Sequence, residues 1–309
     1  MDILFNVGII GIGVLGNAIF ETLNQLHIPV KCYDKYKYNN ETIINNTHNF
    51  VLDINELLDC NMVFLCLPTP YINTKNDNND KNDKNVNKIL LPGVYDKSEI
   101  YNVIDVLNNL VYKGIIIIKS TVEPGTTDTI SNLYPHLCII HNPEFLTART
   151  ATIDFQNQSH IVIGIPSNIH INNNNNNNNN YNNNIIIKFY KTFFTSARIS
   201  ICSSNESECM KIACNAFYAT KIQFFTEIKL LCDVLNINYD NVKMLMLNNG
   251  WINPNHTNVP GSDNNISFGG MCLPKDTNAL NAFMNIHNTP HNVINAVITE
   301  QSIMRDTML

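Results

Sequence analysis

Short runs of aliphatic residues alternate with amphipathic segments along the first two thirds of the chain. Six of these runs predict buried strands, at residues 5–10, 30–33, 62–67, 115–119, 138–140 and 161–165. Helical spacing of apolar residues lies between several of them, notably over 17–26 and 98–110. Because strands buried on both faces alternate here with helices, the pattern predicts an α/β fold with a doubly wound parallel sheet.

The spacing of apolar residues along the chain changes near residue 206. From Glu206 to Leu235, apolar side chains recur at helical spacing, and shorter helical pieces follow. A helix of this length usually joins domains or forms a subunit interface, because its apolar surface needs a partner. We therefore expect a sheet domain over residues 1–200, a small all-helical domain over 201–309, and a homodimer formed through the 206–235 helix.

Two polar tracts interrupt the sheet domain. Residues 73–88 are rich in Asn, Asp and Lys, and residues 168–184 contain a long asparagine run. Neither tract carries enough apolar surface to join a core, so both are expected as surface loops. An expansion tolerated in a surface loop explains these tracts more simply than a role in interaction does.

Composition argues against several classes of function. The 309-residue chain is 44% hydrophobic, carries a formal net charge of −6 and has no long basic block, so we expect no nucleic-acid partner. Its nine cysteines form no CxxC pair, which favours a reducing, cytoplasmic setting over a disulfide scaffold or a metal site. The longest apolar runs fall short of the roughly 18 residues of a membrane span, so no membrane association is expected.

The glycine pattern after the first strand carries the first functional signal. Gly11, Gly13 and Gly16 have the spacing that allows a tight turn, close approach of a pyrophosphate and helix–strand packing. Asp34 ends the second strand, where a carboxylate accepts hydrogen bonds from a ribose diol and repels a 2′-phosphate. The combination predicts a Rossmann-like site for NAD rather than NADP; the alternative is a structural turn with a capping Asp.

Polar runs follow the next three strands, at the edge where open α/β sheets bind ligands. They are Leu67-Pro68-Thr69-Pro70, Lys119-Ser120-Thr121-Val122-Glu123-Pro124-Gly125-Thr126-Thr127 and His141-Asn142-Pro143-Glu144-Phe145-Leu146. Thr121 is a candidate for holding water or the cofactor, and Glu144 for acid–base work or for holding water. Each run is also compatible with a plain strand-ending turn, and Glu144 with a solvated charge.

Two further motifs are candidates for catalysis. Lys211 and Asn215 share one face of the long helix, where both can donate hydrogen bonds to a developing oxyanion. The alternative is that Lys211 forms an ordinary surface pair with Glu208. The second motif is Phe268-Gly269-Gly270-Met271-Cys272-Leu273-Pro274-Lys275-Asp276. Its glycines let a substrate approach and a neighbouring lysine favours the thiolate, so Cys272 is a candidate nucleophile.

In order along the chain, the runs GIGVLG, LPTP, KSTVEPGTT, NPEFL, ESECMKIACNAFYATKI and FGGMCLPKD resemble those of the UDP-glucose/GDP-mannose dehydrogenase family. The resemblance implies an NAD-binding domain over 1–200 and a central dimerisation domain over 201–309 that carries the catalytic cysteine. It also implies oxidation of the C6 alcohol of a nucleotide sugar to the uronic acid with two NAD⁺. UDP-glucose, giving UDP-glucuronate, is the expected substrate. The alternative substrates are GDP-mannose and a UDP-N-acetylhexosamine. The alternative function is that of a truncated, non-catalytic protein that binds NAD or a nucleotide sugar.

The same resemblance assigns catalytic roles by position. Cys272 is expected to attack the C6 aldehyde, giving a thiohemiacetal and then a thioester, which water hydrolyses. Lys211 and Asn215 match the pair that stabilises the oxyanion, and Asp276 matches a general base that acts through water.

Thr121 and Glu144 match residues that position water and assist proton transfer. The implied cofactor contacts are Gly11, Gly13, Val14, Leu15, Gly16, Asp34, Lys35, Pro68, Thr69, Thr121 and Lys275. The implied substrate contacts are Glu144, Phe145, Leu146, Lys211, Asn215, Phe268, Gly269 and Cys272.

Three departures from the family pattern accompany these matches. Ala148 stands where members commonly carry a second glutamate, four residues after Glu144. An Arg-Ile-Gly run expected upstream of the cysteine loop has no match, and His256 is the residue available in its place. The chain also ends at Leu309, where the family usually continues into a second nucleotide-binding-type domain.

Overall fold

The computed structural model describes residues 5–36, 49–72, 95–169 and 178–306, so the loop expected at 73–88 lies outside the described residues. Contacts divide the chain into two compact units. The sheet unit comprises Met1–Thr69 and Asp96–Lys211, and the helical unit comprises Pro70–Tyr95 and Ile212–Leu309. Each unit has a hydrophobic core of its own.

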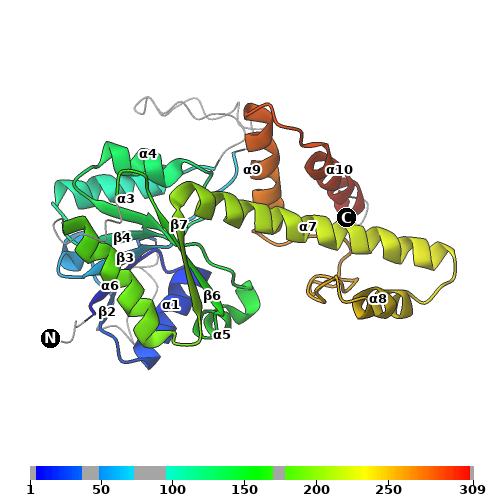
Figure 1. Ribbon diagram of the computed structural model, residues 1–309, viewed down its shortest axis with the longest axis horizontal. Coiled ribbons are helices and arrows are strands. Elements are labelled where there is room, and N and C mark those ends of the chain that lie inside the picture. The colour runs from blue at the N-terminus through cyan, green and yellow to red at the C-terminus, as the bar shows by residue number, and fades with distance from the viewer. Residues whose placement is uncertain (1–4, 37–48, 73–94, 170–177, 307–309) are drawn as a thin grey trace. The chain divides into compact units, whose positions relative to one another are not determined.

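Seven strands form one sheet in the sheet unit (Figure 1). In spatial order they are β2 (Val30–Tyr33), β1 (Val7–Ile10), β3 (Met62–Leu65), β4 (Ile115–Ile118), β5 (Cys138–His141), β6 (His160–Ile165) and β7 (Arg198–Ser203). The four strand pairs from β2 to β5 are all parallel. Their register aligns the first residues of neighbouring strands, so that Val7 lies beside both Val30 and Met62. The chain changes direction across the sheet between β1 and β3, which is where open α/β sheets bind ligands. The predicted doubly wound α/β fold is confirmed.

The sheet departs from the expected all-parallel arrangement at one pair. β5 and β6 run antiparallel where His141 meets Gly164, while β6 and β7 are parallel. The connection from β5 to β6 contains a 3-10 turn, η2 (Ala148–Thr150), and the short helix α5 (Ala151–Gln156). A parallel crossover needs an element long enough to return the chain along the whole sheet. The α-helix of this connection, α5, has 6 residues, against 12 in α1, the helix of the parallel β1–β2 crossover, and β6 enters the sheet in the reverse direction.

Helices cover both faces of the sheet. Along β4, Ile115 and Ile117 face one layer and Ile116 and Ile118 the other, as strand alternation requires. The first layer consists of α1 (Val14–Gln25), α5 and α6 (Asn178–Phe193). The second consists of α3 (Ser98–Asn109), α4 (Thr126–Leu133) and the 3-10 turn η1 (Ile54–Leu57). Figure 1 shows α3 and α4 on the opposite side of the sheet from α1 and α5.

The asparagine-rich tract differs from the expected loop at its C-terminal end. Residues 170–177 lie outside the described residues, but 178–184 form the first turns of α6. Further along this helix, Ile186, Phe189 and Tyr190 are fully buried in the core. Helix formation is cooperative, so a helix anchored by such packing extends into neighbouring polar residues that would not form one alone.

The helical unit is built on the greater part of α7 (Ser204–Val234) together with α8 (Tyr239–Asn248), α9 (Leu273–Ile286) and α10 (Asn292–Asp306). The predicted long helix is therefore confirmed. One small core joins α7, the cysteine loop and α10 through Ala219, Phe268 and Val297, and another around Phe225 joins α7 to α8. Within the described ranges, no helix combines the length and the apolar character needed to cross a bilayer.

A buried carboxylate ties α4 to α7 within the sheet unit. Glu208 of α7 accepts hydrogen bonds from the Gly125 N–H (2.8 Å), the Thr127 N–H (2.8 Å) and the Thr127 hydroxyl (2.5 Å). These donors lie at the start of α4, whose N-cap residue is Gly125 and so offers no side chain of its own. In return, Asp128 of α4 accepts from the Ser204 hydroxyl at the start of α7 (2.8 Å). The two helix starts thus hold each other and fix the loop between β4 and α4.

This contact predicts a pH dependence of stability. Burial raises the pKa of the Glu208 carboxyl from 4.5 to about 7, although its hydrogen bonds favour the charged form. Between these pH values the folded protein keeps a proton that the unfolded chain releases, so the unfolding free energy falls as pH rises. Glu208→Gln lacks this contribution, and we expect its unfolding free energy to fall less steeply, by up to about 1.4 kcal/mol per pH unit. Urea denaturation across the pH series measures the slope.

Glu206→Gln is the matched control. Glu206 is exposed, and hydrogen bonds from Ser203 lower the pKa of its carboxyl, which confines its contribution to more acidic pH. Its slope between pH 4.5 and about 7 is expected to match that of the wild type. Equal slopes for the wild type and Glu208→Gln in that window would contradict the prediction.

Candidate functional site

The glycine turn between β1 and α1 is sterically constrained at two positions and open at the third. A Cβ on Gly16 would lie 2.0 Å from the Gly11 carbonyl oxygen, and one on Gly11 would lie 2.6 Å from the Cys66 carbonyl oxygen. A Cβ on Gly13 would meet no atom within 4 Å. Gly13 is the N-cap of α1, and among the described residues no side chain caps that helix start. The open side of the turn therefore suits the close approach of an anion to backbone amides.

Asp34 braces this turn from the end of β2. Its Oδ2 accepts from the Ile12 N–H (2.7 Å) and its Oδ1 from the Tyr36 N–H (3.0 Å). The neighbouring Lys35, expected at the cofactor, is exposed and has its ammonium 3.8 Å from Glu99 Oε1. The Asp34 carboxylate thus holds the turn in the shape that the glycines permit.

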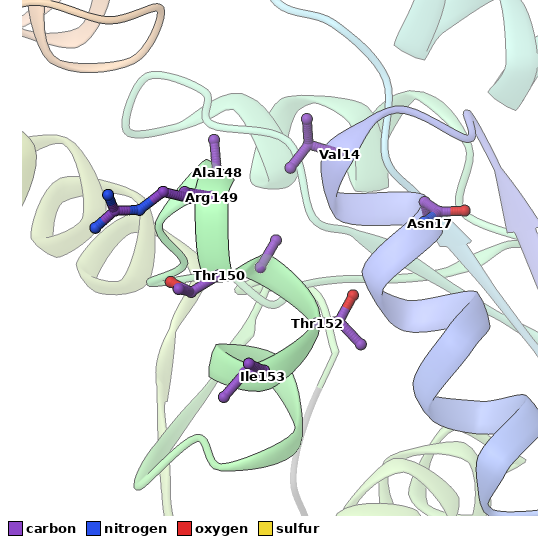
Figure 2. Close-up of a pocket in the computed structure, with 8 residues that line it drawn as sticks. Val14, Asn17, Ala148, Arg149, Thr150, Thr152 and Ile153 are labelled. Atoms are coloured by element: carbon purple, nitrogen blue, oxygen red, sulfur yellow. The ribbon is translucent and has the colours of Figure 1, made fainter. Parts of the chain in front are cut away.

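A cleft of about 360 Å³ opens beside the start of α1 (Figure 2). Val14 and Asn17 of α1 line one side, and residues 148–153 line the other. Val14 is 53% exposed here, whereas Leu15 is half-buried. In Figure 2 the Arg149 guanidinium points away from α1. The cleft thus adjoins the first turn of α1, the helix that follows the glycine turn and whose N-terminal amides can hold an anion.

The loops after β3 and β4 are tied together at the sheet edge. The Thr69 hydroxyl donates to the Thr121 carbonyl oxygen (2.8 Å), and the Ser120 hydroxyl donates to the Leu67 carbonyl oxygen (2.7 Å). Thr69 is buried by this contact, while Pro68 beside it is exposed and Thr121 is half-buried. The structure therefore brings these two predicted runs together.

The glutamate after β5 pairs with the lysine of α7. The Lys211 ammonium lies 3.0 Å from Glu144 Oε1, and both side chains are mostly buried. Glu144 Oε2 accepts from the Leu146 N–H (2.6 Å), and the ammonium lies 5.3 Å from the Phe145 ring centroid. Lys211 thus has Glu144 as its partner, and Glu208 is committed to α4. The alternative of an ordinary surface pair between Glu208 and Lys211 is wrong.

A buried polar network supports the loop after β5, and no functional role was predicted for its residues. The Lys119 ammonium donates to Asn142 Oδ1 (2.9 Å), which also accepts from the Tyr190 hydroxyl (2.5 Å). Burial lowers the pKa of Lys119 to about 8 and that of His141 to about 3, so the imidazole is neutral. The His141 ring shares a hydrogen bond with the Ser207 hydroxyl of α7 (2.8 Å). The network holds the loop after β5 through residues of three distant segments.

In the helical unit, Asp276 is the centre of a second polar cluster. Its carboxylate is 1% exposed and accepts three hydrogen bonds of 2.5 Å, from the Tyr95 hydroxyl, the Lys275 ammonium and the Asn215 amide. Asn215 was nominated from the motif on the long helix and Lys275 and Asp276 from the cysteine motif, and the structure brings the two motifs together. Tyr95 is the residue that sequence reasoning missed, because it follows a polar tract and belongs to no periodic pattern.

Cys272 lies at the N-terminal end of α9, one helical turn before Asp276. Its carbonyl oxygen accepts from the Asp276 N–H (2.9 Å). All nine cysteines lie in the described ranges, and among them only Cys209 and Cys272 are exposed. Burial raises the pKa of the Cys60 and Cys66 thiols to about 12. Cys272 therefore combines an exposed side chain with a position at a helix N-terminus, whereas the raised pKa values of Cys60 and Cys66 disfavour their reactive thiolate forms.

Glycine is favoured at two positions of the cysteine loop for different structural reasons. A Cβ on Gly269 would lie 2.7 Å from Arg305 Nη2 of α10, whereas one on Gly270, at a φ of +78°, would meet nothing within 4 Å. Arg305 also donates to the Ser267 carbonyl oxygen (2.9 Å), and Phe268 is buried in the core beneath. The loop is therefore held by α10 at Gly269 and open at Gly270.

Residues 20–182 match the NAD-binding domain, and residues 205–301 the central domain, of the UDP-glucose/GDP-mannose dehydrogenase family. The chain belongs to this family. A UDP-glucose 6-dehydrogenase from Rickettsia felis is 32% identical over 216 residues, which cover 67% of this chain and 44% of that protein. One from Campylobacter jejuni is 28% identical over 68% of this chain and 49% of its own length. The chain thus spans about half the length of the curated relatives it matches.

Solved structures of dehydrogenases share the fold of this family member. A UDP-glucose dehydrogenase from Pyrobaculum islandicum superposes with a TM-score of 0.76 at 20% identity, over 97% of this chain and 68% of that one. A GDP-mannose dehydrogenase from Pseudomonas aeruginosa superposes with a TM-score of 0.64 at 20% identity, over 97% of this chain and 69% of that one.

NAD is the cofactor of this family member, as the match to the family's NAD-binding domain shows. The sheet unit fits a dinucleotide, because its glycine turn is open at Gly13 and a cleft adjoins the start of α1. In the described part of the chain, no three His, Cys, Asp or Glu side chains gather in a group that could hold a metal ion.

Gly13→Ala and Gly16→Ala are expected to fail in different ways. At Gly13, where φ is −76° and the surrounding space is open, alanine fits the fold, but its methyl group obstructs a pyrophosphate. We expect at least a roughly tenfold loss of NAD⁺ affinity by calorimetry, with stability within about 0.5 kcal/mol of the wild type. At Gly16 the methyl overlaps the Gly11 carbonyl, so we expect a loss of about 1–3 kcal/mol in urea unfolding. Wild-type NAD⁺ affinity in Gly13→Ala would show that the pyrophosphate does not approach this residue.

Proposed function

We propose that this protein is an NAD-dependent nucleotide-sugar 6-dehydrogenase that oxidises the C6 alcohol of UDP-glucose to the carboxylate of UDP-glucuronate. The observation that carries the proposal is the geometry of α9, where the exposed thiol of Cys272 lies one turn before the buried carboxylate of Asp276. Thioester formation and hydrolysis require a thiol nucleophile and a base held near it. The choice of UDP-glucose is supported by the UDP-glucose 6-dehydrogenases among its relatives.

The proposed reaction uses Cys272 as nucleophile and Asp276 as base. Bound NAD⁺ supplies the capacity to accept hydride from C6. Oxidation of the C6 alcohol releases a hydride and a proton and gives the aldehyde. The Cys272 thiolate adds to this aldehyde, forming a C–S bond and an alkoxide that takes up a proton to become the hydroxyl of a thiohemiacetal. Loss of a second hydride from C6 and of the hydroxyl proton, with a second NAD⁺ as acceptor, gives the thioester. At the thioester stage, water adds to the acyl carbon while Asp276 accepts its proton. The C–S bond then breaks and returns the Cys272 thiolate together with the carboxylic acid.

Lys211 and Asn215 are the proposed donors to the oxyanion that forms on C6. They lie one turn apart on α7, so their side chains share a face of the helix. Each is held by a carboxylate, Lys211 by Glu144 at 3.0 Å and Asn215 by Asp276 at 2.5 Å. Donors held in place before the reaction lose little energy to reorganisation when charge develops. Thr121 and Glu144 are proposed to position water.

We assign the remaining contacts on the same basis. The sheet unit acts as the NAD-binding domain, in which Asp34 accepts hydrogen bonds from the ribose hydroxyls and Lys35 lies beside them. Lys275 remains a proposed cofactor contact, although its ammonium is hydrogen-bonded to Asp276. His256 stacks on the Tyr218 ring with centroids 4.9 Å apart, so its ring is committed to that contact. We therefore assign no residue to the place of the family's arginine.

We further propose a homodimer formed through α7. Apolar side chains remain exposed on the part of this helix that belongs to the helical unit: Phe217 is 61% exposed, Leu231 52% and Val234 84%. A helix face of this kind is normally covered in the native assembly. The nine free cysteines support a reducing compartment, and we propose the cytoplasm.

Cys272→Ser tests the proposed chemistry. The wild type, incubated with NAD⁺ and a panel of UDP-glucose, GDP-mannose and UDP-N-acetylhexosamines, is expected to form two NADH per UDP-glucose consumed, with little free aldehyde. Cys272→Ser is expected to lose at least about a thousandfold in kcat, because a serine alkoxide forms far less readily than a thiolate. Its NAD⁺ affinity should be unchanged, since the glycine turn lies in the other unit.

Cys209→Ser is the matched control, because it removes the other exposed thiol. It is expected to keep wild-type turnover. Preference for another sugar in the panel would change the substrate and leave the chemistry in place. Wild-type turnover in Cys272→Ser would remove the thiol from the reaction, and NAD⁺ binding without any NADH would favour a non-catalytic binding protein.

The dimer makes a separate prediction. The wild type should show twice the monomer mass by light scattering at micromolar concentration. The double variant Leu231→Glu, Val234→Glu places charge on the exposed face of α7 and should shift the protein to monomer. Leu133→Glu, a control on α4 at a side chain that is 60% exposed, should leave the mass unchanged. A monomeric wild type would rule out the interface.

A further inference from the structure

Of the three side chains bonded to Asp276, Tyr95 alone lies outside every sequence motif. It is completely buried, and its hydroxyl lies 2.5 Å from Asp276 Oδ1, at the short end of the range for a hydrogen bond to a carboxylate. Its backbone forms an antiparallel bridge with Tyr71, and its side chain belongs to a small core with Ile212 and Ala279. These contacts hold the phenol in place independently of the carboxylate.

The hydrogen bonds give the two oxygens of Asp276 different roles. Oδ1 accepts from both the Tyr95 hydroxyl and the Lys275 ammonium, which occupies the two lone pairs of that oxygen. Among the described residues, Oδ2 accepts from the Asn215 amide alone, which leaves its second lone pair for another donor. A carboxylate takes up a proton through a lone pair, so this arrangement directs proton transfer to Oδ2.

We propose that Tyr95 is a positioning residue for the general base: its hydroxyl holds Oδ1 of Asp276, so that Oδ2 receives the proton of the water that attacks the thioester. The inference rests on the proposed function, because that function makes Asp276 the base. In this step an O–H bond of water breaks, its oxygen bonds to the acyl carbon, and the Cys272 sulfur leaves with the C–S electron pair. Tyr95 keeps its own proton throughout, and water is the only co-reactant.

The charged and titratable groups around this carboxylate come from three segments. From α9, Lys275 contacts Asp276 directly and Cys272 lies one turn before it. From α7, Asn215 is neutral and Lys211 lies one turn nearer the start of that helix. The segment that ends at Tyr95 contributes the phenol.

Substitution of Tyr95 by phenylalanine removes the phenol hydroxyl and keeps the aromatic ring. The Lys275 ammonium lies 4.3 Å from the centroid of the Tyr95 ring, and a phenylalanine ring retains this contact. It also retains the apolar packing against Ile212 and Ala279. Tyr95→Phe is therefore expected to fold, and its effect reports on the hydrogen bond to Asp276.

Tyr95→Phe is compared with Tyr71→Phe, a matched control that removes a phenol hydroxyl from the same small core but not from Asp276. Loss of a donor to the ionised carboxylate makes it protonate at higher pH, so the acid limb of the kcat/KM profile should move to higher pH. We expect kcat to fall about tenfold, a part of what a general base contributes. KM for NAD⁺ should be unchanged, and an acyl adduct on Cys272 should accumulate in quenched samples examined by mass spectrometry. Tyr71→Phe should match the wild type.

The outcomes separate this inference from the function on which it rests. An active wild type together with an unmoved acid limb and an unchanged kcat in Tyr95→Phe would overturn the role of Tyr95. Equal losses in both variants that follow a lowered melting temperature, without movement of the pH profile, would also overturn it, since that pattern denotes a structural role. A wild type that forms no NADH from any nucleotide sugar would overturn the proposed function, and the role of Tyr95 with it.

Discussion

Burial of charge is the constraint on which the site depends. Lys119, Glu208, Lys211 and Asp276 are each no more than 3% exposed. A charge left unpaired at that depth costs several kcal/mol, so each must meet donors or acceptors from other parts of the chain. Those partners come from several segments, among them the start of α4 for Glu208, the loop after β5 for Lys119 and Lys211, and Tyr95 and Asn215 for Asp276. Pairing the buried charges therefore ties distant segments together within each unit.

The consequence for chemistry is a set of groups held in place before any ligand binds. The start of α4 is fastened by Glu208, the loop after β5 by Lys119, and the Lys211 ammonium by Glu144. In the helical unit, three short hydrogen bonds orient the Asp276 carboxylate. Such preorganisation is how enzymes lower barriers that depend on charge developing at one atom. The proposed nucleophile is the exception, because a thiol must be accessible to react.

The sheet combines features common to dinucleotide-binding folds with features particular to this chain. The strand order and the glycine turn follow the general logic of dinucleotide-binding folds, in which ligands occupy the edge where the strand order reverses. The reversed β6 and the long α6 both belong to the part of the chain that follows β5. They enlarge the core, and Tyr190 of α6 reaches Asn142 in the buried network behind the loop after β5.

The amino-acid sequence by itself determined the features that depend on local pattern. The alternation of apolar runs predicts the α/β sheet, helical spacing predicts α7, and glycine spacing predicts the turn at the start of α1. Asp276 was assigned through the resemblance of its run to the dehydrogenase family, whereas Cys272, Lys211 and Asn215 could be nominated because each lies in a short run whose residue types suit one chemistry. These signals need only neighbouring residues, so one sequence was enough to find them.

Only the tertiary structure decided which of those residues have partners and what the partners are. Tyr95 and Asp276 are 181 positions apart, and Glu208 lies 81 positions from Thr127, so no spacing along the chain records either contact. The reversed direction of β6 and the helical start of α6 likewise depend on packing against distant segments. The physical reason is the same in each case. Burial, charge pairing and cooperative helix growth depend on contacts between residues that are distant in the sequence, so their free energies cannot be predicted from local periodicity.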